Sequence, residues 1–340
     1  MKLLRNEKLR NYLTMRLGGS ASFVAEINQK SEIADVMNFA REHQLKTFVL
    51  GEGSNTLAND DGFEGIILHM KIKGFKLINE DYESVTIQFG AGNILDEIVA
   101  ESCRHNLSGI EAMSMIPGTI GAAPVQNVGA YGQDISQTFV ELEAYDTIEN
   151  CFVTLDKNDC EFSYRMSIFR GKAWRRYIIC SVTLRLRKGN PRPPFYKPVE
   201  EVLRERGLTQ YTPQMIRDAV MDIRKWKLPD PNLIPNSGSF FKNAMIDQNK
   251  LEELRSSYPH LKAFYMGNGK YKISTGWLIE QAGLKGVLMH GMQVYDRNAL
   301  VLTNISAYSY ESLAQAREDI MKKVEDIFGI TIVQEVLEIE

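Results

Sequence analysis

The side chains of this sequence that are best suited to chemistry are an arginine, a serine and a lysine in separate motifs. Arg165, in CEFSYRMSIFR, offers a rigid fork of donors that suits a carboxylate or a phosphate, although most such arginines are solvated. Ser239, in NSGSFFKN, is expected at the apex of a bend, because two adjacent phenylalanines should not both face one core. Its hydroxyl could transfer a proton if neighbours stabilise the transition state, and no G-x-S-x-G motif points to acyl transfer. Lys227, in KWKLPDP, could reach the same region or could be an ordinary loop lysine.

A fourth candidate is Glu335, in the C-terminal segment ITIVQEVLEIE. We expect a strand over Ile330–Ile339, which would place Val333, Leu337 and Ile339 on the same face as Glu335. A carboxylate in an apolar row is paired, protonated or functional. The alternative is an edge strand with this face in water, and the sequence favours neither.

Three glycine-rich segments in the first half predict a ligand that is held closely by the main chain: Gly51–Asn55, Phe89–Asn93 and the uncharged Ser114–Gln133. The first, GEGSN, is not a dinucleotide fingerprint, because Thr56 occupies the position of the last glycine and Asn59–Gly62 reads as a turn. Such a loop can still cradle a pyrophosphate with backbone N–H groups. The alternative, which is the commoner case for so short a motif, is an ordinary turn between strands.

The third glycine-rich segment offers two further features. Pro117–Thr119 can open a helix whose first N–H groups face an anion. Asn127, Gly129, Tyr131 and Gly132 could make close polar contacts with a planar ring. The alternative is a tightly packed segment between domains.

Length and composition limit the class of protein. The 340 residues exceed the usual size of one core, which predicts two or more domains. A net charge of −3 gives no sign of nucleic acid or a membrane surface as partner. Four cysteines (Cys103, Cys151, Cys160 and Cys180) have neither C-x-x-C nor zinc spacing, so we expect buried thiols and no metal. With no signal-peptide pattern and no long apolar run, the sequence predicts a cytoplasmic protein.

Hydrophobic periodicity and caps predict the elements that must position these side chains. Lys188–Pro194, KGNPRPP, is the best domain boundary, because three prolines and a glycine interrupt both strand and helix. Ser31 is expected to cap a helix that has Ile33, Val36, Met37 and Ala40 on one face, and Thr212 to cap a helix that starts at Pro213. Further helices are expected to begin near Leu95, Asp247, Ser274 and Ser309. The expected strands are Lys46–Leu50, Val85–Phe89, a hairpin of Phe139–Tyr145 with Cys151–Leu155, Tyr177–Arg187 and Ala299–Thr303.

In this order, the motifs resemble those of the UDP-N-acetylenolpyruvoylglucosamine reductase family. The resemblance covers nearly the whole chain, from MRLGGSA at Met15 through GEGSN, IPGTIGAAPVQNVGAYGQD, FSYRMSIFR, KLPDP, NSGSFFKN and GWLIEQAGLKG. The segment around Tyr196 is similar to the longer, type I branch. The resemblance implies an α+β fold, with a vanillyl-alcohol-oxidase-type (PCMH) FAD-binding domain of two α/β subdomains over 16–188. An α/β substrate-binding domain would follow over 195–340.

The resemblance also implies the chemistry. NADPH would reduce bound FAD, and the reduced flavin would pass hydride to the vinyl β-carbon of an enolpyruvyl UDP-sugar in peptidoglycan synthesis. Arg165 and Glu335 would meet the charge that builds on the substrate carboxylate, and Ser239 would protonate the α-carbon. We expect a monomer. A flavin oxidase of the same fold, or a sugar-nucleotide-binding module without redox activity, stays open as an alternative.

The same resemblance implies binding residues. The FAD pyrophosphate would be held by Gly51, Gly53, Ser54 and Asn55. The flavin would be lined by Ile116, Gly121, Ala122, Gln126 and Gly129, with Arg224 near it. The UDP-sugar would be contacted by Tyr196, Lys227, Asn243 and Asn298. The sequence departs from the family at Asn298, where glutamine is common, and at Leu337, where an arginine is usual.

Overall fold

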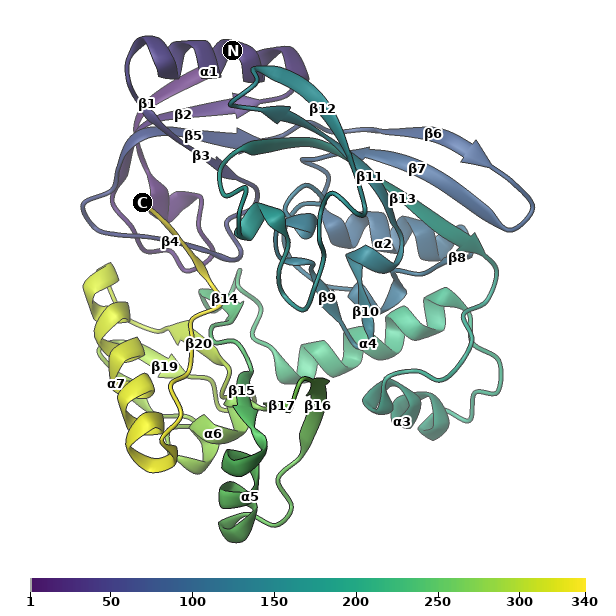
Figure 1. Ribbon diagram of the computed structural model, residues 1–340, viewed down its shortest axis with the longest axis vertical. Coiled ribbons are helices and arrows are strands. Elements are labelled where there is room, and N and C mark those ends of the chain that lie inside the picture. The colour runs from purple at the N-terminus through teal and green to yellow at the C-terminus, as the bar shows by residue number, and fades with distance from the viewer. Residues whose placement is uncertain (1) are drawn as a thin grey trace. The chain divides into compact units, whose positions relative to one another are not determined.

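A computed structural model describes residues 2–340 and divides the chain into two compact units (Figure 1). Unit 1 comprises residues up to Glu7 together with Ala21–Glu52 and Glu64–Lys225. Unit 2 comprises Lys8–Ser20, Gly53–Phe63 and Trp226–Glu340. This division differs from the expected domains 16–188 and 195–340. Part of the difference follows from two helices beyond the proline-rich segment, whose apolar side chains form one cluster with residues of unit 1.

The first sheet of unit 1 has the strand order β1-β2-β5-β3. Its members are β1 (Lys2–Lys8), β2 (Ser20–Ile27), β3 (Lys46–Leu50) and β5 (Phe63–Met70), and β3 runs parallel to β5. Helix α1 (Lys30–Glu42) buries the expected stripe of Ile33, Val36, Met37 and Ala40. The expected Ser31 cap is wrong. Gln29 is the N-cap instead, because its side chain and that of Glu32 form a capping box.

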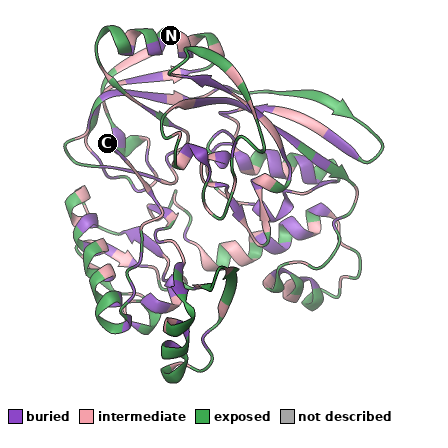
Figure 2. Cartoon of the chain, in the orientation of Figure 1, coloured by how far each residue is buried: buried purple, intermediate pink, exposed green. Residues whose placement is uncertain are grey.

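The second sheet of unit 1 confirms the expected hairpin and places the long strand β13 in its interior. Its order is β12-β11-β13-β7-β6, with β8 paired to the far end of β13. The strands are β6 (Phe75–Glu80), β7 (Ser84–Gly90), β8 (Leu107–Ser108), β11 (Phe139–Asp146), β12 (Cys151–Asp156) and β13 (Tyr177–Lys188). Ser181 and Thr183 lie on the opposite face from the main core and are nevertheless buried. In contrast, the edge strand β6 is exposed along its whole length (Figure 2).

The glycine-rich segment of unit 1 folds into turns and not into the expected helix at Pro117–Thr119. Helix α2 (Leu95–Arg104) and the 3-10 turn η2 (Glu111–Met113) precede it. The N–H groups of Ile120 and Gly121 donate to the carbonyls of Asn93 and Ala91, so they are not available to start a helix. The segment continues through short elements: η3 (Ala123–Gln126), β9 (Gly129–Ala130), β10 (Gln133–Asp134), η4 (Ile135–Gln137) and, farther on, η5 (Ile168–Arg170).

Two helices complete unit 1, α3 (Lys197–Glu205) and α4 (Pro213–Lys227). The start of α4 confirms the sequence prediction, since the Thr212 hydroxyl accepts a hydrogen bond from the N–H of Met215 at 3.2 Å. Among residues 2–340, no helix has the length and apolar character needed to cross a bilayer.

Unit 2 is built from short sheets and three helices around its own core. The first sheet has the order β14-β20-β19-β18, and the second β15-β17-β16. The strands are β14 (Asn236–Ser239), β15 (Ala244–Asp247), β16 (Ala263–Gly267), β17 (Lys270–Ile273), β18 (Leu288–Met289), β19 (Met292–Val294) and β20 (Val301–Asn304). A parallel pair joins β4 (Thr56–Ala58) to β21 (Leu337–Ile339), and the N-terminal part adds the 3-10 turn η1 (Leu9–Asn11). The helices are α5 (Gln248–Ser257), α6 (Thr275–Gln281) and α7 (Tyr310–Phe328).

Three expectations about this sequence, two on burial and one on a strand, are wrong. Phe240 and Phe241 are both fully buried in the core of unit 2, where Phe240 follows the end of β14 and Phe241 forms an isolated bridge with Gln334. The expected strand over Ile330–Ile339 is limited to β21. Of the four cysteines, Cys151 is exposed at the start of β12, whereas the other three are buried.

Candidate active site

The loop after β3 offers backbone donors with little room for side chains. Gly53 has a φ of +63°, and a Cβ at this position would lie 2.0 Å from the carbonyl oxygen of Tyr12. Within residues 2–340, the N–H groups of Gly53 and Ser54 donate to no acceptor. Such donors in a left-handed turn form a concave site for an anion. This part of the loop therefore suits a pyrophosphate.

Within unit 2, Thr14 joins this loop to the segment that carries Ser239. Its hydroxyl donates to the carbonyl of Asn236 at 2.6 Å, and its N–H donates to the carbonyl of Gly53 at 3.2 Å. Sequence analysis did not single out Thr14, because nothing local marks a threonine whose partners lie 39 and 222 residues away.

Ser239 lies at the end of β14 with its side chain exposed. The backbone just before it is distorted: Gly238 has a φ of +70° with open space where a Cβ would point, and the pairing with β20 is irregular. The Asn236 side chain stabilises this turn by accepting from the N–H of Gly238 at 2.9 Å. Among residues 2–340 the Ser239 hydroxyl has no hydrogen-bond partner, so it is available to a ligand.

Glu335 lies in a segment that is hydrogen-bonded to the residues directly after Ser239. Its N–H donates to the carbonyl of Phe240 at 2.8 Å, and Phe241 forms an isolated bridge with Gln334. The half-buried Glu335 is therefore not part of the expected apolar row. Two of the expected row members differ in burial, since Val333 is 55% exposed whereas Ile339 is buried.

The three residues of unit 2 that are expected to contact the sugar nucleotide differ in the hydrogen bonds that they make within the protein. The Asn243 side-chain oxygen accepts from the N–H of Thr275, the first residue of α6, at 3.2 Å. The Asn298 oxygen accepts from the N–H of Leu300 in its own turn. Lys227 is the half-buried last residue of α4.

Arg165 belongs to unit 1 and is held by the glycine-rich segment. One of its guanidinium nitrogens donates to the carbonyl of Gly129 at 2.7 Å, and the other lies 3.4 Å from the carbonyl of Asn127. The guanidinium also lies 5.6 Å from the centre of the Tyr164 ring. These contacts orient Arg165 without neutralising its charge. It is half-buried, in contrast to the solvated side chain that is usual for arginine.

The glycines of the expected flavin segment are required by contacts within the protein. A Cβ at Gly121 would lie 2.5 Å from the Cβ of Ala91, and a Cβ at Gly129 would lie 2.4 Å from the carbonyl oxygen of Gln133. Ala122 is exposed and Ile116 half-buried. The close approach that the sequence indicated is therefore, at these two glycines, an approach to other parts of unit 1.

Gly51 and Gln126 also have partners in unit 1. A Cβ at Gly51 would lie 2.7 Å from the Thr119 hydroxyl. The Gln126 side-chain oxygen accepts from Arg170 at 2.8 Å.

Arg224 extends from α4 to the start of the glycine-rich segment. It donates to the carbonyl of Met115 at 3.1 Å, and its charge interacts with the Tyr131 hydroxyl. Its Nε is buried and, among residues 2–340, has no partner. Burial lowers the pKa of Arg224 and raises that of Tyr131. The Tyr131 ring packs edge-on against the half-exposed Tyr196, with 5.8 Å between the centroids.

An ion pair that the sequence did not reveal supports the same turn. Asp96 accepts from the N–H of Met115 at 2.6 Å and from the nearly buried Arg217 of α4. Burial opposes ionisation of Asp96, but the bonds from Arg217 and Met115 outweigh it and lower its pKa. An acidic residue in the first turn of α2 is expected for the helix dipole alone, so the sequence gave no sign of a partner 121 residues away.

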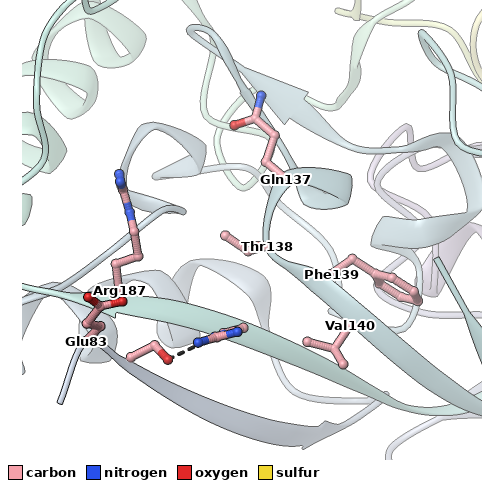
Figure 3. A pocket seen from close by; sticks show the side chains of 8 residues that line it. Glu83, Gln137, Thr138, Phe139, Val140 and Arg187 are labelled. Carbon is pink, nitrogen blue, oxygen red and sulfur yellow. Dashed lines mark hydrogen bonds between the residues drawn. The ribbon is translucent and has the colours of Figure 1, made fainter. Parts of the chain in front are cut away.

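A cavity of about 370 Å³ lies elsewhere in unit 1, beside β7 and β13 (Figure 3). It is lined by Glu83, Ser84, Gln137, Thr138, Phe139, Val140, Arg185 and Arg187. None of the expected site residues lines it, so it is not the candidate active site.

Comparisons with known proteins decide between the alternatives left open by the sequence. A model of an FAD binding domain matches residues 21–148, and a model of the C-terminal domain of UDP-N-acetylenolpyruvoylglucosamine reductase matches residues 230–339. The reductase of Amoebophilus asiaticus is 35% identical over 336 residues, which cover 99% of both chains. This chain belongs to the UDP-N-acetylenolpyruvoylglucosamine reductase family. The reductase of Ralstonia nicotianae is 38% identical over 94% of both chains.

The fold agrees with membership of this reductase family. The crystal structure of the Thermus caldophilus reductase covers 100% of this chain at a TM-score of 0.66 and 21% identity, with 98% of that chain matched. The expected α+β class and FAD-binding domain are confirmed, and the protein is an FAD oxidoreductase. Three observations on residues 2–340 fit FAD: the N–H groups of Gly53 and Ser54 that donate to no acceptor, the left-handed turn at Gly53, and the buried Nε of Arg224 that has no partner.

Proposed function

We propose that this member of the reductase family uses NADPH to reduce the enolpyruvyl group of UDP-N-acetyl-3-O-(1-carboxyvinyl)-glucosamine, which yields UDP-N-acetylmuramate for peptidoglycan synthesis. One hydride from NADPH and one proton from solvent add across the carbon–carbon double bond, and NADP is released. Bound FAD supplies the chemistry that carries the hydride from the nicotinamide to the vinyl β-carbon. The printed names of the relatives support the substrate class.

Ser239 is the proposed proton donor to the α-carbon of the substrate. A neutral serine is a weak acid, so it can act only on a strongly basic carbon such as that formed when hydride adds beside a carboxylate. The exposed position of Ser239 and its lack of a partner among residues 2–340 support this role.

Arg165 and Glu335 are the proposed stabilisers of the substrate carboxylate, on which charge builds as the hydride arrives. A fixed guanidinium and a carboxylic acid both favour this charge over that of the ground state. The bonds from Arg165 to the carbonyls of Gly129 and Asn127 support the role, since they fix its guanidinium before substrate binds.

Further residues are proposed to hold the ligands. Lys227 and Tyr196 would contact the diphosphate and sugar, with Asn243 and Asn298 nearby. For FAD, Gly51, Gly53, Ser54 and Asn55 would bind the pyrophosphate. Ile116, Gly121, Ala122, Gln126, Gly129 and Arg224 would lie along the flavin. We further propose that FAD-binding residues fall within 16–188, apart from Arg224, and that substrate-binding residues fall within 195–340, apart from Arg165. The protein would be a cytoplasmic monomer.

The observation that supports this proposal most directly is the hydrogen bond between Glu335 and Phe240, which keeps the proposed acid Ser239 and the glutamate in neighbouring segments. The test is anaerobic titration of the purified holoprotein with NADPH, followed by addition of the enolpyruvyl UDP-sugar. Bleaching by NADPH and recovery of the oxidised flavin spectrum with this compound, but not with UDP-N-acetylglucosamine, is the expected result. A flavin that stays reduced would contradict the proposal.

A further inference from the structure

A polar cluster joins α7 to the C-terminal segment that carries Glu335. It consists of Tyr310 and Arg317 of α7 together with Gln334 and Glu338, and we call it the Arg317 cluster. All four residues belong to unit 2, and Figure 1 shows the chain after α7 running back past the helix. The two sides of the cluster are 17 to 28 residues apart in sequence.

Arg317 and Glu338 are the centre of this cluster. One guanidinium nitrogen of Arg317 donates to Glu338 at 2.8 Å and to the side-chain oxygen of Gln334 at 2.9 Å. The same Glu338 oxygen accepts from the Tyr310 hydroxyl at 2.6 Å and from the Gln334 amide at 3.0 Å. Gln334 also donates to the carbonyl of Val336 at 2.8 Å. Both ends of the Gln334 amide are therefore held.

The charged groups of the Arg317 cluster are partly buried, so each of them depends on its partners within the cluster. The Arg317 side chain is 19% exposed and that of Glu338 28%. Burial works against ionised Glu338, but the bonds from Tyr310, Gln334 and Arg317 lower its pKa nevertheless. Burial and the bond to Glu338 raise the pKa of Tyr310 to about 12. If the guanidinium is removed, a partly buried carboxylate is left without its counter-ion, and the segment must rearrange.

One member of the Arg317 cluster, Gln334, directly precedes Glu335 in the chain. Gln334 belongs both to the cluster and to the bridge with Phe241, and the N–H of the next residue, Glu335, donates to the carbonyl of Phe240. The side chain of Gln334 is held by Arg317, whereas its backbone pairs with the segment that follows Ser239. A shift of Gln334 would therefore be passed to Glu335 before any other candidate side chain.

We propose that Arg317 is a positioning residue, which fixes the Glu335 carboxylate through Gln334 and Glu338. This inference rests on the proposed role of Glu335 in the reduction of the enolpyruvyl group. Arg317 itself touches neither ligand in this proposal. Its contribution is the orientation of a group that must meet charge in the transition state, for which displacements of about 1 Å can cost roughly 100-fold in rate.

The test compares Arg317→Met with Lys323→Met, which removes an exposed positive charge from the same helix. Flavin reduction by NADPH and flavin reoxidation by the enolpyruvyl UDP-sugar are measured separately by stopped flow. For Arg317→Met we expect reduction within about twofold of wild type and reoxidation slower by roughly 10- to 100-fold. Lys323→Met should change neither rate. Arg317→Lys, which keeps the charge beside Glu338, should recover part of the loss.

Hydrogen exchange provides a readout that does not depend on turnover. In Arg317→Met, the peptide that contains residues 333–338 should exchange faster, whereas the β15–β17 sheet should keep its wild-type rates. Equal slowing of both half-reactions, or no change in either with unchanged exchange at 333–338, would overturn the positioning role. If the wild-type flavin is not reoxidised by the substrate, the proposed function fails, and the exchange result alone decides whether Arg317 fixes this segment. If Arg317→Met folds poorly, Gln334→Ala replaces it in both measurements. Slower reoxidation with faster exchange at 333–338 would again support the positioning role, and the results named above would again overturn it.

Discussion

The N–H of Glu335 donates to the carbonyl of Phe240 across 2.8 Å, one residue beyond Ser239. Two segments that are separated by almost 100 residues in the chain are thus paired backbone to backbone. Backbone pairing fixes where both side chains begin without using either of them, and the Ser239 hydroxyl has no hydrogen-bond partner among residues 2–340. This relationship leads to different predictions for the two residues.

Replacement of Ser239 should separate the two half-reactions. Ser239→Ala removes the proposed proton donor, so reoxidation of the flavin by the enolpyruvyl UDP-sugar should slow by roughly 10²- to 10⁴-fold. Reduction by NADPH should be nearly unchanged, and stopped-flow absorbance reports both rates. Ser237→Ala is a matched control, because the Ser237 hydroxyl is buried without a partner among residues 2–340 and its loss should be close to neutral. Equal slowing of both steps in Ser239→Ala would identify the serine as structural.

Replacement of Glu335 should slow the same half-reaction, because the charge on the substrate carboxylate is less well stabilised. The supply of the proton to the α-carbon should not change. Glu335→Gln keeps the size of the side chain and the backbone bond to Phe240, but it removes the acid that can meet the developing charge. We expect slower reoxidation by roughly 10²- to 10³-fold and unchanged reduction by NADPH. A solvent isotope effect on reoxidation should persist in Glu335→Gln, since Ser239 still supplies the proton. A wild-type reoxidation rate would remove Glu335 from the mechanism.

Local patterns were sufficient for most helices and strands of this protein. Thr212 and Pro213 predicted the start of α4, and Ser309 caps α7 by accepting from the N–H of Ser312. These features depend on neighbours within one helical turn, which a sequence displays directly.

The sequence failed where distant segments decide the structure. The expected helix at Pro117 is prevented by bonds to the carbonyls of Asn93 and Ala91. The two phenylalanines after Ser239 are both buried, and Phe241 pairs with Gln334, which lies 93 residues farther along the chain. The site shows the same limit. The motifs indicated candidate side chains, whose chemical roles stay predictions. Thr14 and Arg317 were not indicated, because their partners lie far away in the sequence and no local pattern reveals them.

Gly53 is constrained both by its positive φ and by the lack of space for a Cβ, and comparison with a second glycine separates these two effects. Gly53 and Gly207 have nearly the same backbone angle, with φ of +63° and +66°. A Cβ at Gly207 meets nothing within 4 Å, so Gly207→Ala should cost only the left-handed strain of about 1 kcal/mol. Gly53→Ala adds a clash with the carbonyl of Tyr12, and we expect a total loss of roughly 2–4 kcal/mol.

Urea unfolding of the Gly53→Ala and Gly207→Ala proteins, with flavin absorbance of the purified samples, measures both effects. Gly53→Ala should also be isolated with less bound FAD, because the donors of the loop move with it. Equal stability of the two variants would show that the loop yields easily at Gly53, in which case it is a poor candidate for a preformed anion site.

His69 should make the stability of the protein depend on pH between about 6.5 and 4. It lies in β5, and burial, followed by the positive charge of Lys71, lowers its pKa to about 4, while a bond to the backbone of Gly51 and the carboxylates of Glu26 and Glu52 oppose the shift. Because the unfolded chain takes up the proton near pH 6.5, the stabilisation by neutral His69 is complete above that pH. It is lost progressively as the pH falls towards 4, by about 2 kcal/mol once partial exposure of the ring is allowed for.

The measurement is the free energy of unfolding in urea at pH 7.5, 6.0 and 5.0 for wild type, His69→Gln and His260→Gln. His260 is exposed, so its replacement should leave the pH dependence of wild type unchanged. His69→Gln should lose less stability than wild type on acidification, since the glutamine takes up no proton in either state. Other groups titrate in the same range in all three proteins, and only the difference between the curves reports on His69. Parallel curves for wild type and His69→Gln would mean that the His69 ring takes up its proton as readily in the folded protein as in the unfolded chain.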